Sequence, residues 1–315
     1  MRFLPNRLST GTRGVASSVA VVGALLALSA CSPFSNNSTA ATVNGKSISR
    51  DTLEGYIAEF ATNKQLEMVN GVVNADDARG VLSGIIKAKA YNDYLVSVGK
   101  PLTATQRASV MKSLADQGVA DLSKNLQNLI VDINGATAAI SSLKAPSAST
   151  IKRLYNESPS LTGALCARHI VVKKKATAER LIAMLSNGAN FASLAKKYSI
   201  EPAAKKSGGA LEGQTSDGKP TPCMSILEYQ QNFDPAFTAG VLAAKAGVPF
   251  GPVQSSFGWH VILLEKWDDV KAAALAVVNA QPGANLATGW LAHADITVDP
   301  AYGHWVPATG SIAAN

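Results

Sequence analysis

The sequence is poor in aromatic residues and in long apolar runs. Phenylalanine, tryptophan and tyrosine together make up 6% of the 315 residues, whereas alanine is abundant. Alanine favours helices and leaves small side chains between them, so a mainly helical body is expected. The apolar stretch 15–28 is shorter than the about 20 residues that a membrane-spanning helix needs. A transmembrane helix is therefore the weaker interpretation of this stretch.

Residue patterns that mark several enzyme and binding classes are also missing from the sequence. It contains no metal-ligand cluster, no glycine-rich phosphate loop and no nucleophile elbow, and no Ser-His-Asp set is ordered as a triad. No long basic run with interleaved aromatic residues occurs, which argues against nucleic-acid binding. We therefore expect no cofactor, no bound metal and no nucleic-acid partner.

The first thirty residues have the composition of an export signal. Arg2, Arg7 and Arg13 precede the apolar stretch, and no acidic residue lies among them. The stretch ends in Leu-Ser-Ala-Cys at 28–31, which resembles a bacterial lipobox. Cleavage before Cys31 would make this cysteine the site of lipid attachment. We expect a lipoprotein on the outer face of a bacterial cell membrane, with more than one acyl chain for stable anchoring.

Removal of this signal changes the charge and leaves a polar segment at the new N-terminus. Lys plus Arg falls from 29 to 26 while Asp plus Glu stays at 22, so the net charge falls from +7 to +4. A moderate positive charge suits an anionic envelope. The Ser- and Asn-rich segment 31–41 is predicted to be a flexible tether.

Three cysteines occur in the sequence, and only two of them remain for pairing if Cys31 carries lipid. Cys166 and Cys223 can form a disulfide outside the cytoplasm, and a bridge that closes so long a loop would contribute about 4 kcal/mol. We favour this disulfide. Two free thiols remain the alternative, because a count of cysteines does not fix their connectivity.

Local signals mark where helices begin. Ser49 is suited to cap a helix that follows a short strand with an Asn-Gly turn. Thr103 and Gln106 have the spacing of a capping box. Such signals, together with apolar residues at helical spacing, predict several helices between 42 and 160.

The pattern of elements changes near residue 161. From 161 to 267 the order becomes strand, helix, helix, loop, helix, strand, which indicates an α+β unit of about 100 residues. The segment 268–300 is predicted to be helical again. The small and polar residues of 301–315 predict a loose tail.

Five short motifs occur in order within the α+β unit. They are Arg-His-Ile-Val-Val at 168–172, Phe-Ala-Ser-Leu-Ala-Lys-Lys-Tyr-Ser at 191–199, Lys-Ser-Gly-Gly-Ala-Leu at 206–211, Gly-Pro-Val at 251–253 and Phe-Gly-Trp-His-Val-Ile at 257–262. Their order and secondary structure resemble parvulin-type peptidyl-prolyl isomerases. The resemblance implies a small antiparallel sheet with surrounding helices.

The segment before this unit resembles the chaperone region of SurA- and PrsA-type foldases, through Val-Asn-Gly-Lys-Ser-Ile-Ser at 43–49. In those proteins the chain after the parvulin unit packs back onto the N-terminal helices. We therefore expect 42–160 and 268–300 to form one chaperone-like domain, with the parvulin unit inserted between them.

The resemblance also assigns candidate catalytic residues. His169 and His260 correspond to two adjacent histidines on the central strands, with a positional and electrostatic role; two unrelated, partly buried histidines are the alternative. Ser255 matches a position near this pair. Glu201 stands where parvulins usually have Asp or Cys, and it either faces the substrate or is a solvated loop residue.

Candidate substrate-binding residues are apolar. Phe237, Leu242 and Phe257 match the floor that receives the proline ring, and Phe233 lies one helical turn before Phe237. Apolar residues at this spacing are also typical of plain core, and Leu242 suits either role.

Two features of the unit differ from the family's pattern: one loop and one run of lysines. The loop 212–222 is longer and more polar than the usual turn and could cover the pocket. Lys173, Lys174 and Lys175 follow the first strand where phospho-dependent parvulins hold a phosphate. We interpret them as a solvated loop, because the arginines of that pattern are absent.

These observations predict a lipid-anchored foldase that isomerises Xaa-Pro bonds in unfolded secreted polypeptides. The first alternative is a chaperone that holds unfolded chains while its parvulin unit is weak or inactive. The second is a solute-binding or structural lipoprotein, which would explain the lipobox but not the ordered motifs.

Overall fold

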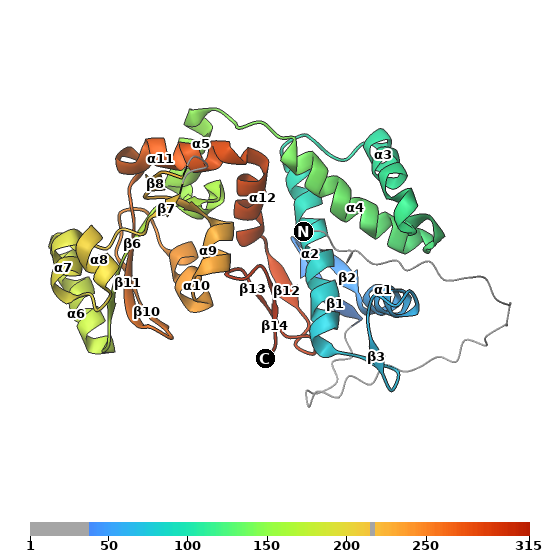
Figure 1. The fold of residues 1–315 in the computed structure, drawn as a ribbon, viewed down its shortest axis with the longest axis horizontal. Helices are drawn as coiled ribbons and strands as arrows, with labels where there is room; N and C mark the ends of the chain where they lie inside the picture. Colours follow the sequence, from blue (N-terminus) through green and yellow to red (C-terminus); the bar gives the residue numbers. More distant parts are fainter. Residues whose placement is uncertain (1–37, 215–217) are drawn as a thin grey trace.

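The computed structural model describes residues 38–214 and 218–315 (Figure 1). The predicted signal peptide and the Cys31 lipid site lie outside the described residues. Within the described residues, every helix is too short or too polar to cross a membrane. Helices and small antiparallel sheets alternate along the chain, which confirms the predicted α+β class.

Two separated stretches of sequence build a mainly helical body. Its strands form one three-stranded sheet and two hairpins, and its long helix α2 runs alongside the sheet (Figure 1). The elements are β1 (Thr39–Val43), β2 (Lys46–Ser49), α1 (Arg50–Thr62), β3 (Met68–Val69), β4 (Val72–Val73), α2 (Ala75–Ser97), α3 (Ala104–Leu114), η1 (Ala115–Gln117), η2 (Val119–Asp121), α4 (Lys124–Ser141), α5 (Ala148–Glu157), α11 (Trp267–Ala280), α12 (Pro282–Ala292), β12 (Ile296–Val298), β13 (His304–Val306) and β14 (Ser311–Ala313).

Predicted helix starts in this body are confirmed. The Ser49 side chain accepts a hydrogen bond from the Thr52 amide at 3.1 Å, and this bond caps α1. Thr103 and Gln106 exchange side-chain and backbone hydrogen bonds as a capping box at the start of α3. Each bond satisfies a backbone N–H that a helix leaves unpaired in its first turn.

The beginning and the end of the described chain meet in one sheet. β12 pairs with β1 in antiparallel register, with Ala41 opposite Val298. Arg50 Nη2 lies 3.0 Å from Oδ2 of the buried Asp299. The predicted tether 31–41 is therefore too long, because β1 already begins at Thr39, and Ala40 and Ala41 within this strand are buried.

The prediction of a loose tail is wrong. β13 and β14 form a hairpin, and the Ile312 amide donates to Ser83 Oγ of α2 at 3.0 Å. Ile312 is 8% exposed and belongs to the core of the body. Gly303 has a φ of +119°, and a Cβ there would lie 2.0 Å from the Ala313 carbonyl oxygen. The small residues serve close backbone approach instead of disorder.

The inserted unit is built on a three-stranded antiparallel sheet of order β10–β11–β6. The helices α6, α7 and α8 follow β6, and α10 packs on β10 and β11. The elements are η3 (Pro159–Thr162), β5 (Ala164–Leu165), β6 (Ala167–Val172), α6 (Lys175–Ser186), α7 (Phe191–Tyr198), α8 (Pro202–Ser207), β7 (Gly213–Gln214), β8 (Pro220–Thr221), β9 (Met224–Ser225), α9 (Ile226–Asn232), α10 (Pro235–Ala243), β10 (Phe250–Ser255) and β11 (Gly258–Leu264).

A buried disulfide joins Cys166 and Cys223 in the structure. It links the residue before β6 to the residue before β9 and closes the base of the β7–β8 hairpin. This base lies at the Ala167 end of β6, whereas the β10–β11 turn lies at the Val172 end. The two ends of the predicted loop 212–222 thus lie near α11 (Figure 1) and away from the β10–β11 turn.

Candidate active site

The structure brings His169 and His260 together on one face of the sheet. In the antiparallel register His260 pairs with Val171, and His169 pairs with Ile262. The two histidines are therefore diagonal neighbours on adjacent strands, whose side chains share a face. Their Nδ1 atoms lie 3.3 Å apart, and the ring planes differ by 16°.

A polar side chain lies at each end of the histidine pair. Glu201 Oε2 is 2.6 Å from His169 Nε2, and Ser255 Oγ is 2.7 Å from His260 Nε2. The Ile200 amide donates to the Val171 carbonyl at 2.9 Å, which holds the segment with Glu201 against β6. The four side chains form a continuous line of short contacts.

Burial and the contacts along this line shift the pKa of His260 and of Glu201. Burial, and then the neighbouring His169, lowers the pKa of His260 to about 4, so His260 is neutral at neutral pH. The interaction with His169 lowers the pKa of Glu201 and outweighs the effect of its partial burial. Glu201 is therefore an ionised acceptor in the same range.

These charge states favour one direction of hydrogen bonding. A carboxylate can only accept, so a His169 ring with one proton carries it on Nε2, toward Glu201. His169 Nδ1 then accepts from His260 Nδ1–H, and His260 Nε2 accepts from the hydroxyl of Ser255. Ser255 Oγ in turn accepts from the Phe257 amide at 3.1 Å. The line thus fixes both imidazole rings.

An aromatic wall stands against the histidines. The Phe237 ring centroid lies 5.4 Å from that of His169 and 4.8 Å from that of His260, and Phe237 is 2% exposed. The Phe233 ring lies 5.7 Å from Phe237. Close packing of α10 depends on Gly240, where a Cβ would lie under 3.0 Å from Val253. The predicted Phe237 and Phe233 are therefore brought to the site.

The other two predicted apolar residues are placed differently. Phe257 is 71% exposed in the β10–β11 turn, two residues after Ser255, so it lies at the rim rather than in a floor. Leu242 lies five residues after Phe237 on α10, about 140° further around the helix. It is half-buried and packs on the apolar cluster that contains Leu165, Tyr229 and Phe237. Leu242 therefore lies in the packing behind the wall, and a role in substrate binding stays a prediction.

Sequence reasoning missed Asp234, which ties the wall to the rim. Its Oδ1 accepts from the Ala236 amide at 2.8 Å and caps α10. Its Oδ2 accepts from the Ser256 amide at 3.2 Å and from Ser256 Oγ at 2.9 Å. Slight burial raises the pKa of Asp234, but these hydrogen bonds lower it by a larger amount, so the net shift of the pKa is downward. The Asp-Pro pair at 234–235 is a helix-start signal that could have identified it.

The described residues contain no group of three or more His, Cys, Asp or Glu side chains that could hold a metal ion. What the site does offer is an apolar wall, two imidazoles of which His260 is neutral at neutral pH, and fixed polar groups at both ends. This set suits binding and reshaping of a neutral group rather than cleavage of a covalent bond.

Comparison with known proteins agrees with this geometry. Residues 162–266 match the family model described as the PPIC-type PPIase domain. This segment is a parvulin-type domain. It contains His169, Glu201, Ser255 and His260.

The similarity to known proteins extends beyond the parvulin domain. It is 33% identical over 133 residues to the foldase protein PrsA of Clostridium kluyveri, a match that covers 42% of this chain and 34% of that protein. The chain thus spans about a third of the length of this relative. It is 27% identical over 254 residues to the foldase protein PrsA of Geobacillus sp. (strain WCH70), which covers 80% of each.

Among solved structures, the crystal structure of PrsA from Bacillus subtilis is 21% identical to the chain. The match covers 80% of this chain and 90% of that one, with a TM-score of 0.28.

Proposed function

We propose that the protein is an extracytoplasmic peptidyl-prolyl cis–trans isomerase that assists the folding of exported polypeptides. The observation that carries this proposal is the contact of His169 and His260 with each other and with Phe237 inside a parvulin-type domain. The substrates in this proposal are Xaa-Pro bonds of unfolded or partly folded secreted chains.

The reaction needs no bond to break. Its obstacle is amide resonance, which gives a rotational barrier of about 18–20 kcal/mol and an uncatalysed time of tens to hundreds of seconds. In the twisted amide the carbonyl oxygen carries less charge and the prolyl nitrogen is more basic. A catalyst must bind this twisted form better than either planar form.

The site can supply that preference. The buried Phe237 ring offers an apolar surface to the proline ring, and an apolar surface withholds the water that stabilises the polar planar amide. His169 and His260, oriented by Glu201 and Ser255, present fixed dipoles that need no rearrangement during rotation. In this proposal the four polar side chains position and polarise, while Phe237, Phe233 and the rim residue Phe257 bind.

The test is cis–trans exchange of Xaa-Pro peptides measured by NMR with the chain from residue 32 onward. We expect the parent to accelerate exchange and the His260→Ala and Phe237→Ala variants to lose most of the acceleration. Circular dichroism checks that both variants fold, and Ser193→Ala on the exposed face of α7 is the matched control. A folded parent without acceleration on any peptide would refute the enzymatic proposal.

Attachment to the membrane through a lipid on Cys31 is the second part of the proposal. The small residues before Cys31 support it, and so does the Cys166–Cys223 disulfide, which suits an oxidising compartment outside the cytoplasm. Labelled fatty acid should enter the parent protein in a bacterial host and be absent from Cys31→Ala. Equal labelling of the two proteins would contradict lipidation at Cys31.

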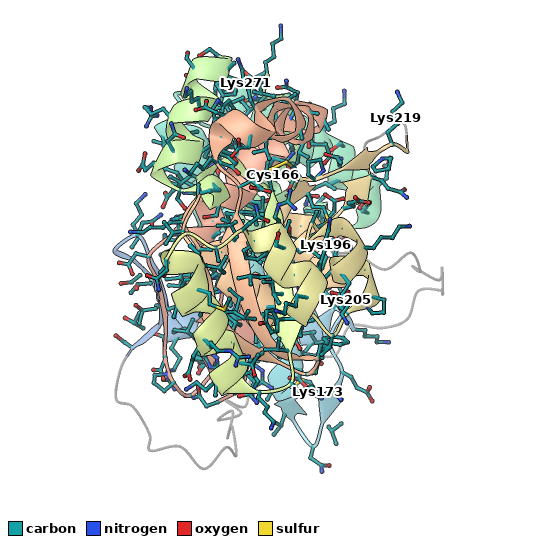
Figure 2. All side chains as sticks on the ribbon, turned by 90° about the vertical axis from the view of Figure 1, so that its left-hand side faces the viewer. Cys166, Lys173, Lys196, Lys205, Lys219 and Lys271 are labelled. Carbon is teal, nitrogen blue, oxygen red and sulfur yellow. A yellow bond between two sulfur atoms is a disulfide. The ribbon has the colours of Figure 1, made fainter. Side chains whose placement is uncertain are left out.

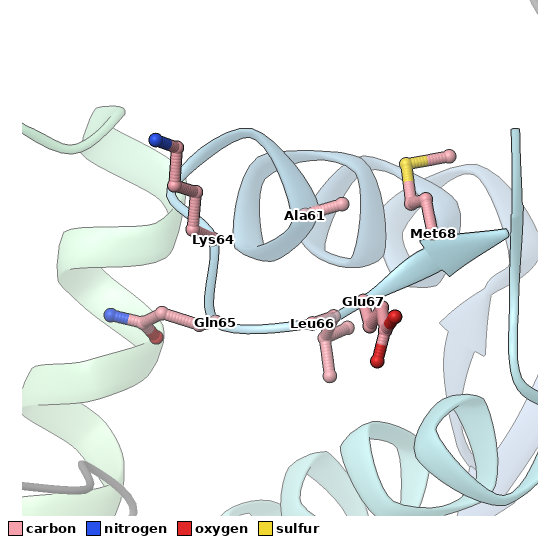
Figure 3. A pocket seen from close by; sticks show the side chains of 6 residues that line it. All are labelled: Ala61, Lys64, Gln65, Leu66, Glu67 and Met68. Atoms are coloured by element: carbon pink, nitrogen blue, oxygen red, sulfur yellow. The ribbon is translucent and has the colours of Figure 1, made fainter.

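A holding role of the helical body is a second candidate function. The β3–β4 hairpin exposes Met68 (42%) and Val69 (65%). Beside it lies an open hollow of about 550 Å³, lined by Leu66, Met68 and the end of α1 (Figure 3). Exposed apolar groups of this kind can bind unfolded chains.

Suppression of client aggregation tests this role separately from isomerisation. If the body holds clients, His260→Ala should still suppress aggregation, and Met68→Ser with Val69→Ser should suppress it less. Loss of suppression in His260→Ala alone would assign the effect to the parvulin domain.

A further inference from the structure

The net positive charge of the chain after residue 30 comes entirely from the parvulin domain. Residues 162–266 contain 12 Lys plus Arg and 7 Asp plus Glu, a balance of +5. The remaining residues, 31–161 and 267–315, contain 14 Lys plus Arg and 15 Asp plus Glu, a balance of −1. Together they give the +4 of the whole segment, so the charge is segregated and not diffuse.

Most of this charge lies on a short stretch of the domain. Residues 173–206 hold eight of the 12 basic residues and two acidic ones, and all eight basic side chains are exposed. Figure 2 looks onto this end of the molecule, where Lys196 and Lys205 lie near mid-height and Lys173 lies below them. We define the basic face as Lys173, Lys174, Lys196, Lys197, Lys205 and Lys206.

The basic face borders the candidate active site on one side through the strand that carries His169. Lys173 and Lys174 directly follow β6, and Val172 pairs with Trp259 of β11. The β10–β11 turn lies tightly against this end of β6, because a Cβ on Gly258 would lie 2.7 Å from the Val172 carbonyl oxygen. The turn that presents Ser255 and Phe257 thus meets the start of the lysine run.

The basic face reaches the site a second time through α8. This helix begins after Glu201, which contacts His169, and it carries Lys205 and Lys206 at its last turn. A substrate chain that leaves the histidines on either the β6 or the α8 side therefore passes exposed ammonium groups.

The acidic groups at the site form no ion pair with the basic face within the described residues. Glu201 contacts His169, and Asp234 accepts from Ser256. Within 38–214 and 218–315, Lys173 and Lys174 take part in no ion pair, whereas Lys175 lies 3.6 Å from Glu179. The charge of the basic face is therefore available to a partner in solution.

The kind of cation points to the kind of partner. Seven of the eight exposed basic residues in 173–206 are lysines, whose ammonium is a point charge on a flexible stem and lacks the bidentate geometry of arginine. The exception, Arg180, lies over the Tyr198 ring. The lysines are spread over three segments and do not converge on one pocket. Such a surface suits a flexible chain with several carboxylates better than a single phosphate.

We propose that the basic face attracts acidic segments of unfolded polypeptides, so that the preferred substrates are Xaa-Pro bonds flanked by Asp and Glu. The proposal rests on the isomerase function proposed above. A surface of one sign next to a site raises the local concentration and the association rate of ligands of opposite sign by about tenfold or more at low salt. Salt at 0.1 M screens beyond about 10 Å, so the effect should fall with ionic strength.

The experiment compares kcat/KM for three proline peptides that differ only in flanking residues: four Glu, four Lys, or four neutral polar residues. At low salt we expect the parent to prefer the acidic over the neutral peptide by about tenfold, and the preference should vanish near 0.5 M salt. Lys173→Glu with Lys174→Glu should bring the ratio of kcat/KM for the acidic peptide to kcat/KM for the neutral peptide down to about one. Lys112→Glu with Lys144→Glu, the same charge change on exposed sites of the helical body, should retain it.

A binding measurement separates this inference from the enzymatic one. An acidic peptide without proline should bind the parent at low salt and bind the Lys173→Glu, Lys174→Glu variant at least fivefold more weakly, even if no isomerisation is found. Equal ratios in the parent and in this variant would overturn the proposal. Binding of anionic phospholipid vesicles with no binding of acidic peptides would also overturn it and assign the face to lipid.

Discussion

The parvulin domain is held together mainly within its own span, whereas the helical body is closed by contacts between distant parts of the chain. In the domain, β6 and β11 pair directly, and Cys166 bonds Cys223, 57 residues away. In the body, Arg50 pairs with Asp299 across 249 residues. A change near the C-terminus should therefore affect the body more than the domain. The disulfide lies at the junction of the two regions, because Cys166 and Cys223 pack with Ile140 and Trp267 of the body, and its loss should affect the domain more than the rest of the body.

The two regions also differ in charge. The domain carries the excess of lysine on its outer end, and the body is close to neutral. A nearly neutral body with exposed apolar residues suits contact with many unfolded chains, whereas a positively charged domain would add a preference for acidic segments. The following predictions test this division, from the largest expected effect to the smallest.

Removal of the disulfide should have the largest effect, and this effect should be larger in the domain than in the parts of the body remote from the two cysteines, which pack against Ile140 and Trp267. Cys166→Ser with Cys223→Ser should lower the unfolding free energy of residues 162–266 by about 4 kcal/mol, because the unfolded loop regains its freedom. Hydrogen exchange read by mass spectrometry resolves the two regions. Equal loss of protection in α2 and α4 would show that the regions unfold as one unit.

Acid should destabilise the domain before the body. The folded pKa of His260, about 4, lies below its ordinary value of 6.5. Between these values the unfolded state binds a proton that the folded state does not, so stability falls as pH falls from 6.5 to 4. One such proton gives a slope of about 1.4 kcal/mol per pH unit and roughly 3 kcal/mol over the window.

Denaturant unfolding of the domain from pH 8 to pH 4 measures this effect. His260→Phe should flatten the slope, and His304→Asn, an exposed histidine of the body, should leave it as in the parent. The lowered pKa of Glu201 adds a loss of the same sign at the acid end. A slope unchanged in His260→Phe would exclude His260 as its source.

The C-terminal hairpin should be a stabilising part of the body. Ile312→Ala should lower the unfolding free energy of the body by about 2 kcal/mol, because it leaves a cavity against α2. Isomerisation by the domain should stay within twofold of the parent. Thermal unfolding and the NMR exchange assay measure both, and no loss of stability would restore the interpretation of a loose tail.

The smallest expected effect is on the orientation of His260. Ser255→Ala removes the hydroxyl 2.7 Å from His260 Nε2 and should cost about 1 kcal/mol of stability. It should lower kcat/KM by roughly tenfold, the equivalent of about 1.4 kcal/mol. Ser193→Ala is the control on an exposed helix face. A change in KM alone would mean that Ser255 acts on binding and not on orientation.

Local signals in the sequence predicted much of the fold and of the site. Ser49 and the pair Thr103 and Gln106 identified helix starts, because a capping bond spans only two or three residues. The order of the five motifs predicted two strands that carry His169 and His260, and antiparallel pairing of those strands places the histidines on one face. The α+β class followed from the same order of elements.

The sequence did not predict which apolar residues of the site face the histidines. Phe237 and Leu242 are both apolar residues of α10, and only the packing of that helix on the sheet decides that Phe237 contacts the rings. Phe257 is an exposed rim residue, which its motif position did not show. Asp234 also matters only because the β10–β11 turn comes within hydrogen-bonding distance of it.

By itself, the sequence determined the helix caps and the order of the motifs, because these depend on neighbours a few residues apart. The histidine pair, 91 residues apart, was predicted only through the resemblance of the motifs that carry each member. Only the tertiary structure decided that the tail packs on α2, that β12 pairs with β1, and that the lysines gather on one end of the molecule. Each of these depends on which segments, far apart in sequence, bury surface against one another or share a face, and local patterns carry no information on that choice.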